Sequence, residues 1–189
     1  VFIELLNGKA TDSQISAILV AMKMRGESVE EITAGVEVLK NNCIEVKISC
    51  DAIDIVGTGG DGKGTLNIST AASFVVAGAG MPVAKHGNRN LSSLSGSADV
   101  LEMLGLDLNL TPKKISESIQ KAGIGFMMAP NHHPTIKNVM IARKEIGIRT
   151  IFNILGPLAN PANVKYQLTG CYDEKLLKPM IETLKRLGC

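Results

Sequence analysis

The stretch "DIVGTGGDGKGTLNIST", residues 54–70, decides the fold prediction because it places five glycines between two apolar runs. Glycine loses more conformational freedom on folding than other residues, so such a cluster needs a reason. "IDIV" has the pattern of a short strand, and "STAASFVVAGAG" that of a helix with Ser69 or Thr70 as N-cap. A glycine loop between a strand and a helix N-terminus is typical of phosphate binding.

Apolar segments of strand and helix character alternate along the rest of the chain. We expect strands at 53–56, 81–85, 124–129, 149–155 and 165–172, and helices at 69–80, 95–104, 111–123, 133–147 and 173–188, with Pro179 as a kink. Thr111 and Gly123 are expected to cap the third of these helices. This alternation predicts an α/β fold with a parallel sheet.

The first 48 residues differ from this pattern and predict a small helical domain. Two capping boxes, Thr11 with Gln14 and Ser28 with Glu31, predict two helices joined by a short turn as an antiparallel pair. Such a pair must cover its apolar faces with a neighbouring domain or a second copy of the chain. We therefore expect a helical domain at 1–48 and an α/β domain at 49–189, with helices within 106–145 as candidates to pack against the former.

Composition excludes several classes of function. The 189 residues carry 20 basic and 18 acidic side chains, a net charge of +2, and 3% aromatic residues without Trp, which argues against nucleic-acid binding. No leader pattern opens the chain, and the longest apolar run, 71–84, is too short to span a bilayer. We expect a cytoplasmic protein with four reduced cysteines. Both ends interrupt apolar or helical patterns, so we expect a fragment.

The glycine loop alone leaves two other nucleotide sites open. Gly57, Gly59 and Gly62 match the spacing G-x-G-x-x-G, but the helix opens only near Ser69, and the next strand ends in basic residues instead of an acidic one. The P-loop pattern fails at one position, because a glycine follows Lys63 where Ser or Thr is needed. A generic P-loop nucleotide binder therefore remains an alternative.

A second polar cluster, "KHGNRNLSSLSGSAD" at 85–99, follows the next strand and precedes a helix. In a parallel sheet it lies at the same edge as the glycine loop. Lys85 and Arg89 can neutralise phosphate, Asn88 offers an amide, and several serines offer hydroxyls. Together with Asp61 of the first loop, these groups suit a substrate that carries several phosphates and is bound with Mg²⁺.

The combined motifs "GTGGDG", "NIST", "KHGNR" and "SGSADVLE", in this order and spacing, resemble the anthranilate phosphoribosyltransferase family. The later segment "HPTIKNVMIARKEIGIRTIFNILGPLANP" is similar to the anthranilate side of that family. The resemblance implies a nucleoside phosphorylase/phosphoribosyltransferase-like fold and a homodimer formed through the N-terminal helices. It also implies a reaction of tryptophan biosynthesis, in which the amine of anthranilate displaces pyrophosphate from 5-phosphoribosyl 1-diphosphate.

The resemblance further implies which residues bind the substrates, and it requires no nucleophilic side chain. The expected phosphoribosyl-diphosphate site contains Gly57, Gly60, Asp61, Thr65, Asn67, Ser69, Thr70, Lys85, His86, Gly87, Asn88, Arg89, Ser92, Ser93 and Ser97. The expected anthranilate site contains Gly57, Asn88, His133, Arg143, Gly156 and Pro157, with Arg143 on the carboxylate. The Ser69 hydroxyl is expected on Mg²⁺, and an adjacent Asp-Glu pair is expected beyond Cys189.

Other interpretations compete with these assignments. His132 is expected in solvent, and Arg143 could pair with Glu145 on the helix surface instead of with a ligand. A pyrimidine nucleoside phosphorylase of the same fold, or a non-catalytic module that binds a phosphorylated ligand, is an alternative function. Since the acidic pair is absent and Leu94 replaces an expected polar residue, these 189 residues are expected to turn over poorly.

Overall fold

The computed structural model describes residues 1–59, 66–89 and 96–189, and its centre is a four-stranded parallel sheet. The strands are β1 (Ile53–Gly57), β2 (Val83–Gly87), β3 (Ile124–Met128) and β4 (Tyr166–Gly170), in the order β3-β2-β1-β4. All the pairings are parallel, as expected for strands separated by helical crossovers. The predicted α/β fold is confirmed.

Alternation along the strands sends neighbouring side chains to opposite faces of the sheet. In β2, Lys85 pairs in register with Phe126, and His86 pairs with Met127. Phe126 packs with α5 (Ser97–Met103), whereas Met127 packs with α6 (Pro112–Ala122). Lys85 and His86 therefore point to opposite faces of the sheet, although they are neighbours in sequence.

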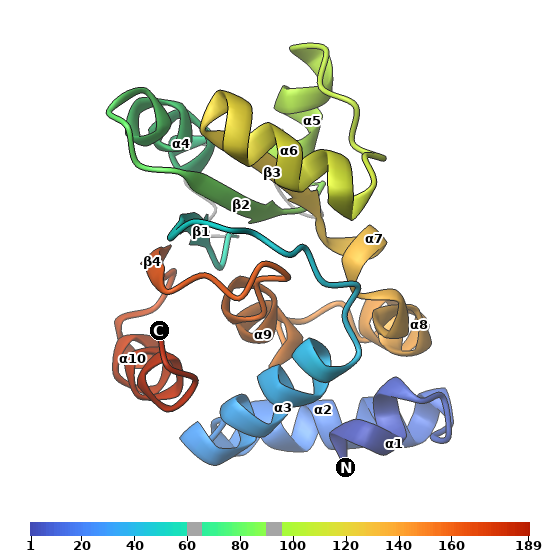
Figure 1. Ribbon diagram of the computed structural model, residues 1–189. Helices are drawn as coiled ribbons and strands as arrows, with labels where there is room; N and C mark the ends of the chain where they lie inside the picture. The colour runs from blue at the N-terminus through green and yellow to red at the C-terminus, as the bar shows by residue number, and fades with distance from the viewer. Residues whose placement is uncertain (60–65, 90–95) are drawn as a thin grey trace.

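Three helices lie beside the upper part of the sheet in Figure 1: α4 (Ile68–Gly78), α5 and α6. The cap prediction for α6 is confirmed, since Thr111 accepts from the backbone of Lys114 and Gly123 takes the left-handed conformation. The packing of α6 also requires a glycine on the strand beneath it, because a Cβ at Gly125 would approach Ile119 to 2.7 Å. The sheet and α6 are thus in very close contact.

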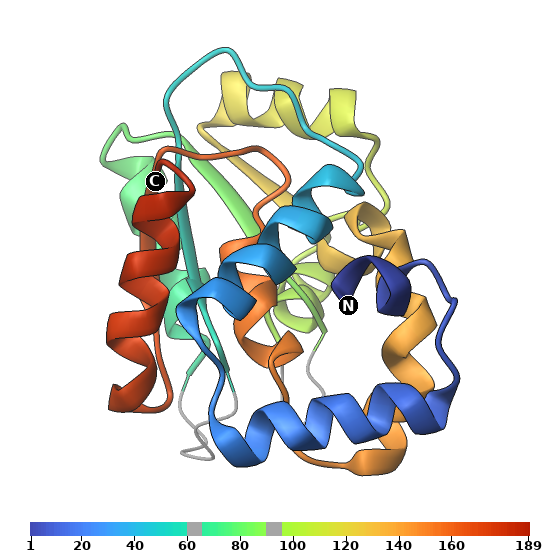
Figure 2. The ribbon, with the colours of Figure 1, turned by 90° about the horizontal axis from the view of Figure 1, so that it is seen from below.

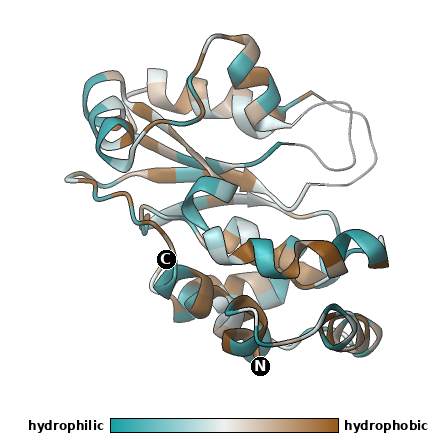
Figure 3. Cartoon of the chain, turned by 90° about the vertical axis from the view of Figure 1, so that its right-hand side faces the viewer, coloured by the Kyte–Doolittle hydropathy of each residue, from teal (hydrophilic) through white to brown (hydrophobic). Residues whose placement is uncertain are grey.

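A second layer, below the sheet in Figure 1, is built from helices of both ends of the chain. They are α1 (Phe2–Leu6), α2 (Asp12–Arg25), α3 (Val29–Asn41), α8 (Lys137–Ile146), α9 (Phe152–Leu158) and α10 (Leu177–Arg186), with the short turns α7 (Ala129–His132), η1 (Pro134–Ile136) and η2 (Glu174–Leu176). One hydrophobic core joins them, so residues 1–41 pack on helices contributed by the second half of the sequence. Figure 3 shows brown, hydrophobic residues in the strands and on parts of these helices.

Two predictions about these helices are wrong. Both capping boxes are present, but α2 packs on α8 while α3 packs on α9 and α10, and Figure 2 shows α2 and α3 diverging from their turn. They are not an antiparallel pair, because other helices of the same chain cover their apolar faces. The expected strand at 149–155 is largely helix α9, whose residues Phe152, Ile154, Leu155 and Leu158 are all buried. A short run that is apolar on every side does not distinguish a buried strand from a buried helix.

Within the described ranges, no helix is both long enough and apolar enough to cross a membrane.

Candidate active site

The carboxyl ends of the strands form the edge at which both sequence motifs emerge. The strand order reverses at β1, whose neighbours are β2 on one side and β4 on the other. Open parallel sheets bind ligands outside the carboxyl ends of strands at such a reversal. At this edge the backbone N–H of Thr58 donates to Gly170 (3.0 Å), and that of Tyr172 donates to the Thr58 hydroxyl (3.1 Å). These bonds join the ends of β1 and β4 at this edge.

The hydroxyls of "NIST" make tertiary contacts and do not cap a helix. Helix α4 starts at Ile68 after Asn67, which puts Ser69 and Thr70 in its first turn, so the N-cap prediction is wrong. The Thr70 hydroxyl donates to Ser97 (2.9 Å), and the Ser69 hydroxyl accepts from the Lys85 ammonium (3.3 Å). These bonds join the two predicted phosphate motifs, 67–70 and 85–97, at the N-termini of α4 and α5.

Lys85 is a buried cation, with only 2% of its surface exposed. Its ammonium also donates to the carbonyl of Ile55 (2.5 Å). Burial lowers the pKa of Lys85 to about 8, against the opposing attraction of the Asp54 carboxylate. A cation held beneath two hydroxyl-bearing helix termini makes this part of the edge favourable for an anion.

Asp54 is fully buried on β1 and belongs to the same polar network. Its carboxylate accepts from the backbone N–H of His86 (3.1 Å) and from the side-chain amide of Asn160 (2.7 Å). Burial raises the pKa of Asp54 to about 6, while Asn160 and Lys85 oppose that shift. The site prediction omitted both Asp54 and Asn160. The available signal for the first was a carboxylate inside the apolar strand "IDIV", and Asn160 had no comparable signal.

Two buried histidines face the helical layer. The rings of His86 and His133 meet edge to face, with centroids 5.2 Å apart. Burial lowers the pKa of His86 well below its usual value and that of His133 to about 4, so both are neutral at pH 7. His133 donates from Nε2 to Ala159 (2.9 Å), which leaves its Nδ1 and the Nε2 of His86 buried without a partner among the described residues. A bound polar ligand can form hydrogen bonds with these two nitrogens.

The third histidine corrects a prediction. His132 was expected in solvent, but it is 2% exposed, and its Nδ1 bonds to the carbonyl of Ile44 (2.7 Å). It therefore ties α7 to the segment that follows α3, because a ring nitrogen and a backbone carbonyl satisfy one another.

Arg143 has no carboxylate partner in the parts of the chain that the structure describes, so the expected alternative pair with Glu145 is not formed. Its guanidinium lies 5.3 Å from the centre of the Phe152 ring and 3.8 Å from the sulfur of Met140. Burial lowers the pKa of Arg143. An arginine that is half-buried over an aromatic ring retains its donors for an external carboxylate.

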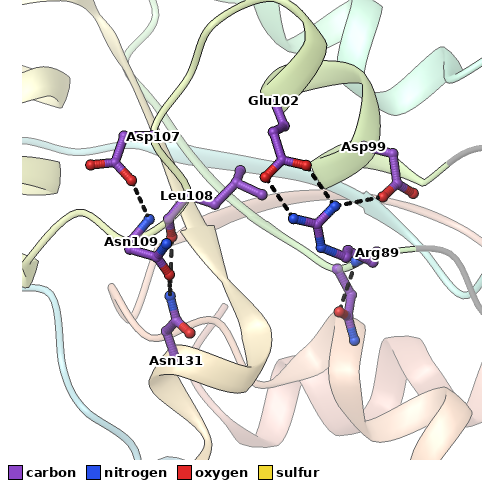
Figure 4. Close-up of polar contacts among 8 residues, drawn as sticks. Arg89, Asp99, Glu102, Asp107, Leu108, Asn109 and Asn131 are labelled. Carbon is purple, nitrogen blue, oxygen red and sulfur yellow. Dashed lines mark hydrogen bonds and ion pairs between the residues drawn. The ribbon is translucent and has the colours of Figure 1, made fainter.

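Arg89 differs, because two carboxylates of α5 already hold its guanidinium (Figure 4). It pairs with Glu102 through two bonds of 2.7 Å and with Asp99 at 3.0 Å. These bonds raise the pKa of Arg89 and lower that of Glu102. The neighbouring Asn88 accepts from the Arg89 backbone (2.7 Å). A phosphate at Arg89 would have to compete with these partners.

The remaining predicted residues occupy the same edge or the layer beside it. Gly87 ends β2, where a Cβ would approach Phe126 to 2.7 Å and Ser97 to 3.3 Å, so a glycine is needed for this close packing. Gly57 ends β1 opposite Gly170. Gly156 and Pro157 lie within α9, and the Gly156 backbone interacts with His86. Five predicted residues lie outside the described ranges: Gly60, Asp61, Thr65, Ser92 and Ser93.

The described residues alone provide little for a metal ion, since no three of their His, Cys, Asp or Glu side chains gather as a ligand set. The Ser69 hydroxyl keeps a lone pair beyond its bond with Lys85 and can serve as one oxygen ligand. Mg²⁺ commonly takes only one or two protein ligands and completes its shell with water and substrate phosphates. One hydroxyl beside a phosphate site therefore fits this ion.

Comparison with known proteins assigns the chain to a family. Residues 49–189 match the family described as "Glycosyl transferase family, a/b domain", and residues 1–43 match "Glycosyl transferase family, helical bundle domain". The chain therefore belongs to this glycosyl transferase family.

Within that family, the chain is similar to anthranilate phosphoribosyltransferases, and the predicted resemblance is confirmed. It is 54% identical over 187 residues to that of Afipia carboxidovorans and 53% identical to that of Rhodopseudomonas palustris, covering 99% of this chain. The match covers 56% and 55% of those proteins, so the chain spans about half the length of its relatives.

Solved structures agree with this assignment. The anthranilate phosphoribosyltransferase of Thermus thermophilus matches with a TM-score of 0.95 and 43% identity, over 100% of this chain and 57% of that one. The Saccharomyces cerevisiae enzyme "in complex with PRPP and Mg" matches with a TM-score of 0.86 and 29% identity, over 99% and 55%. Another structure of the yeast enzyme, a variant, holds 4-fluoroanthranilate.

Proposed function

We propose that this chain binds 5-phosphoribosyl 1-diphosphate and anthranilate and belongs to an enzyme that transfers the phosphoribosyl group to the anthranilate amine, a step of tryptophan biosynthesis. One observation carries the proposal: Lys85 and His86, adjacent residues of β2, point to opposite faces of the sheet. Lys85 joins the hydroxyls of α4, whereas His86 joins His133 in the helical layer. This arrangement can hold an anionic donor and an aromatic acceptor on the two sides of one strand.

We assign the face of β2 that carries Lys85, beside α4, to the diphosphate of the donor substrate. Lys85 and the hydroxyls of Ser69, Thr70 and Ser97 would bind its oxygens, together with the expected loop residues. When bound at Ser69, Mg²⁺ would neutralise part of the negative charge of the diphosphate. Pyrophosphate leaves from C1 as the C–N bond forms, so these residues act by holding and stabilising the developing charge of the leaving group.

We assign the face of β2 that carries His86, beside His133, to anthranilate, the acceptor substrate. The guanidinium of Arg143, which has no carboxylate partner among the described residues, suits the carboxylate of anthranilate. The ring nitrogens of His86 and His133 that lack a partner within those residues suit its other polar group. Because both rings are neutral at pH 7, neither adds charge to the pocket. The Nδ1 of His133 can accept a hydrogen bond, since the ring proton is on Nε2, and the Nε2 of His86 can donate or accept one. Gly156 and Pro157 would line the wall of the pocket.

The division into a helical domain at 1–48 and an α/β domain at 49–189 belongs to the same proposal, as does a homodimer through the N-terminal helices. Val1, Ile3 and Met24 are more than half exposed there, and apolar surface of this kind favours self-association. Analytical ultracentrifugation of the chain and of an Ile3→Glu variant tests the dimer. Cell fractionation tests the expected cytoplasmic location.

The direct test of function is fluorescence-monitored consumption of anthranilate in the presence of 5-phosphoribosyl 1-diphosphate and Mg²⁺. Both this chain and a version extended to the length of its relatives are assayed, and we expect the extended protein to turn over faster. Binding of both substrates without turnover by either protein would favour the non-catalytic alternative. Phosphorolysis of a pyrimidine nucleoside would favour the phosphorylase.

Arg143 supplies a sharper test. Arg143→Met should raise KM for anthranilate by about thirtyfold, because it removes one charge-assisted pair that contributes ~2 kcal/mol to binding. KM for 5-phosphoribosyl 1-diphosphate should change much less. Lys144→Met is the matched control, because it removes an exposed cation from the next position of α8. Equal effects of the two variants on KM for anthranilate would contradict the assigned carboxylate site.

A further inference from the structure

The junction between β1 and β2 is held by side chains near the site. Within their described residues, β1 and β2 share one ladder pair, Ile53 with Val83, whereas β1 shares five with β4. Beyond that pair, the Asp54 carboxylate accepts from the N–H of His86, and the Lys85 ammonium donates to Ile55. Beyond their one shared ladder pair, the two strands are thus bonded through two side chains.

Asn160 extends this junction to the helical layer. Its amide donates both to Asp54 (2.7 Å) and to the carbonyl of Ala84 (2.9 Å), and its side-chain oxygen accepts from the N–H of Ala162 (2.8 Å). Asn160 is 4% exposed, so each of these bonds is shielded from water. The side chain therefore connects β1, β2 and the segment after α9.

The same segment holds one ring of the histidine pair. The carbonyl of Ala159, adjacent to Asn160, accepts from Nε2 of His133. On the other side of the pair, the backbone of His86 is the group that Asp54 binds. The hydrogen bond between Asp54 and Asn160 thus connects the segment that binds the His133 ring to the backbone of His86.

A buried carboxylate is costly unless its oxygens are satisfied, and apolar residues of similar volume often stabilise a protein as well or better. Burial here raises the pKa of Asp54 to about 6 although Asn160, Lys85 and the His86 N–H lower it, so the cost of burial outweighs the stabilisation that these partners give the ionised carboxylate. A charge that does not strengthen the fold needs another explanation. The geometry supplies one, because both oxygens of Asp54 meet groups that support the two rings.

We propose that Asp54 and Asn160 act as a pair of positioning residues that set the spacing and orientation of the His86 and His133 rings for the aromatic acceptor. The inference rests on the proposed function for the identity of that acceptor. Neither residue touches the acceptor, and the pair acts through the His86 backbone and through the segment 159–162.

Histidine NMR tests the proposal directly, since the chain contains three histidines and the third provides an internal reference. Asp54→Asn turns an amide toward the amide of Asn160, a donor against a donor, and breaks the contact. We expect the ring resonances of His86 and His133 to move together, while those of His132, held by Ile44, stay in place. Unchanged His86 and His133 rings in a folded variant would overturn the proposal.

A second substitution provides the rescue. Asn160→Asp in the Asp54→Asn background restores a donor facing an acceptor and still accepts from Ala162, but it sets an oxygen against the carbonyl of Ala84. Both rings should therefore return part of the way toward their original resonances. Recovery of stability without return of the rings would refute the positioning role. If Asp54→Asn does not fold, Asn160→Ser removes the same contact from the other side. Paired shifts of the two rings in that variant support the proposal, and unchanged rings refute it.

Kinetics of the complete protein separate this inference from the proposed function. Asp54→Asn should raise KM for anthranilate by about tenfold, the effect of one lost orienting hydrogen bond, with a smaller change in KM for the donor. A kcat loss with both KM values unchanged would contradict acceptor positioning. If the unsubstituted protein does not use anthranilate at all, the proposed function fails, whereas the ring measurement still decides whether Asp54 positions the histidines.

Discussion

Lys85 and Arg89 are two cations of one motif, "KHGNR", but the first is buried and the second is exposed. Lys85 is 2% exposed, binds a backbone carbonyl and a hydroxyl, and has its pKa lowered by burial to about 8. The Arg89 side chain is 46% exposed, is held by two carboxylates, and has its pKa raised by those bonds.

The difference shows that the contribution of a charged side chain to stability depends more on its position in the fold than on its residue type. Solvent screens the ion pairs of Arg89, and exposed pairs of this kind contribute little to stability. Lys85 is desolvated, so its partners cannot be replaced by water at low cost. The buried network of Asp54, Lys85, His86, His133 and Asn160 should therefore respond strongly to substitution, and the Arg89 cluster should respond weakly.

The largest effect is expected from Lys85→Met. The substitution removes the counter-charge of the buried Asp54 carboxylate and should lower the free energy of unfolding by about 3 kcal/mol at pH 7. Urea unfolding followed by circular dichroism measures it. Adding Asp54→Asn should recover at least half of the loss, because the unpaired charge is then gone. If Lys85→Met lowers the free energy of unfolding no more than Arg89→Met does, the proposed difference between the two cations is contradicted.

A similar effect is expected from pH acting on His133. Its pKa is lowered to about 4 in the folded chain, so below pH 6.5 the unfolded chain binds a proton that the folded chain does not. The stability that neutral His133 contributes is present above pH 6.5 and is lost as pH falls to about 4. The loss amounts to about 3 kcal/mol. Urea unfolding of the wild type and of His133→Gln at pH 7 and 4.5 measures it. A difference between the two proteins that does not vary with pH would contradict the low pKa.

A smaller effect is expected where the two phosphate motifs meet. Thr70→Val removes the buried bond to Ser97 and should cost about 1 kcal/mol. A double-mutant cycle with Ser97→Ala should give a coupling energy of about the same size. Additive single effects would show that the two hydroxyls do not support one another, so that the motifs only lie near each other.

The smallest effect is expected from Arg89→Met and from its matched variant Glu102→Gln. Both break exposed ion pairs of α5, so neither should shift the urea midpoint measurably, at low or high salt. A salt-dependent destabilisation by either variant would show that the Arg89 cluster supports the fold, and it would remove the contrast with Lys85.

The fold was largely predictable, because its signals are local. The capping boxes at Thr11 and Ser28, and the αL glycine after α6, require only residues within one turn. The wrong predictions concern tertiary environment. Helix α9 was taken for a strand since its apolar residues are buried on all sides, and His132 was placed in solvent although Ile44 binds it.

The sequence predicted which polar residues gather at the candidate site, but not which partners their side chains have. Ser69 and Thr70 were identified, but their hydroxyls bond Lys85 and Ser97 and do not cap α4. Asn160 lies 106 residues from Asp54 in the chain, and only folding brings the two side chains to 2.7 Å. No local pattern records a contact over that separation.

The sequence by itself determined the alternation of strands and helices and the edge of the sheet at which the polar motifs gather, because periodicity and capping act between near neighbours. The tertiary structure alone decided which of those polar groups are buried, which are paired, and toward which face of the sheet each one points. Burial and pairing depend on surfaces from distant parts of the chain, and they set the pKa and the hydrogen-bond partners of each group.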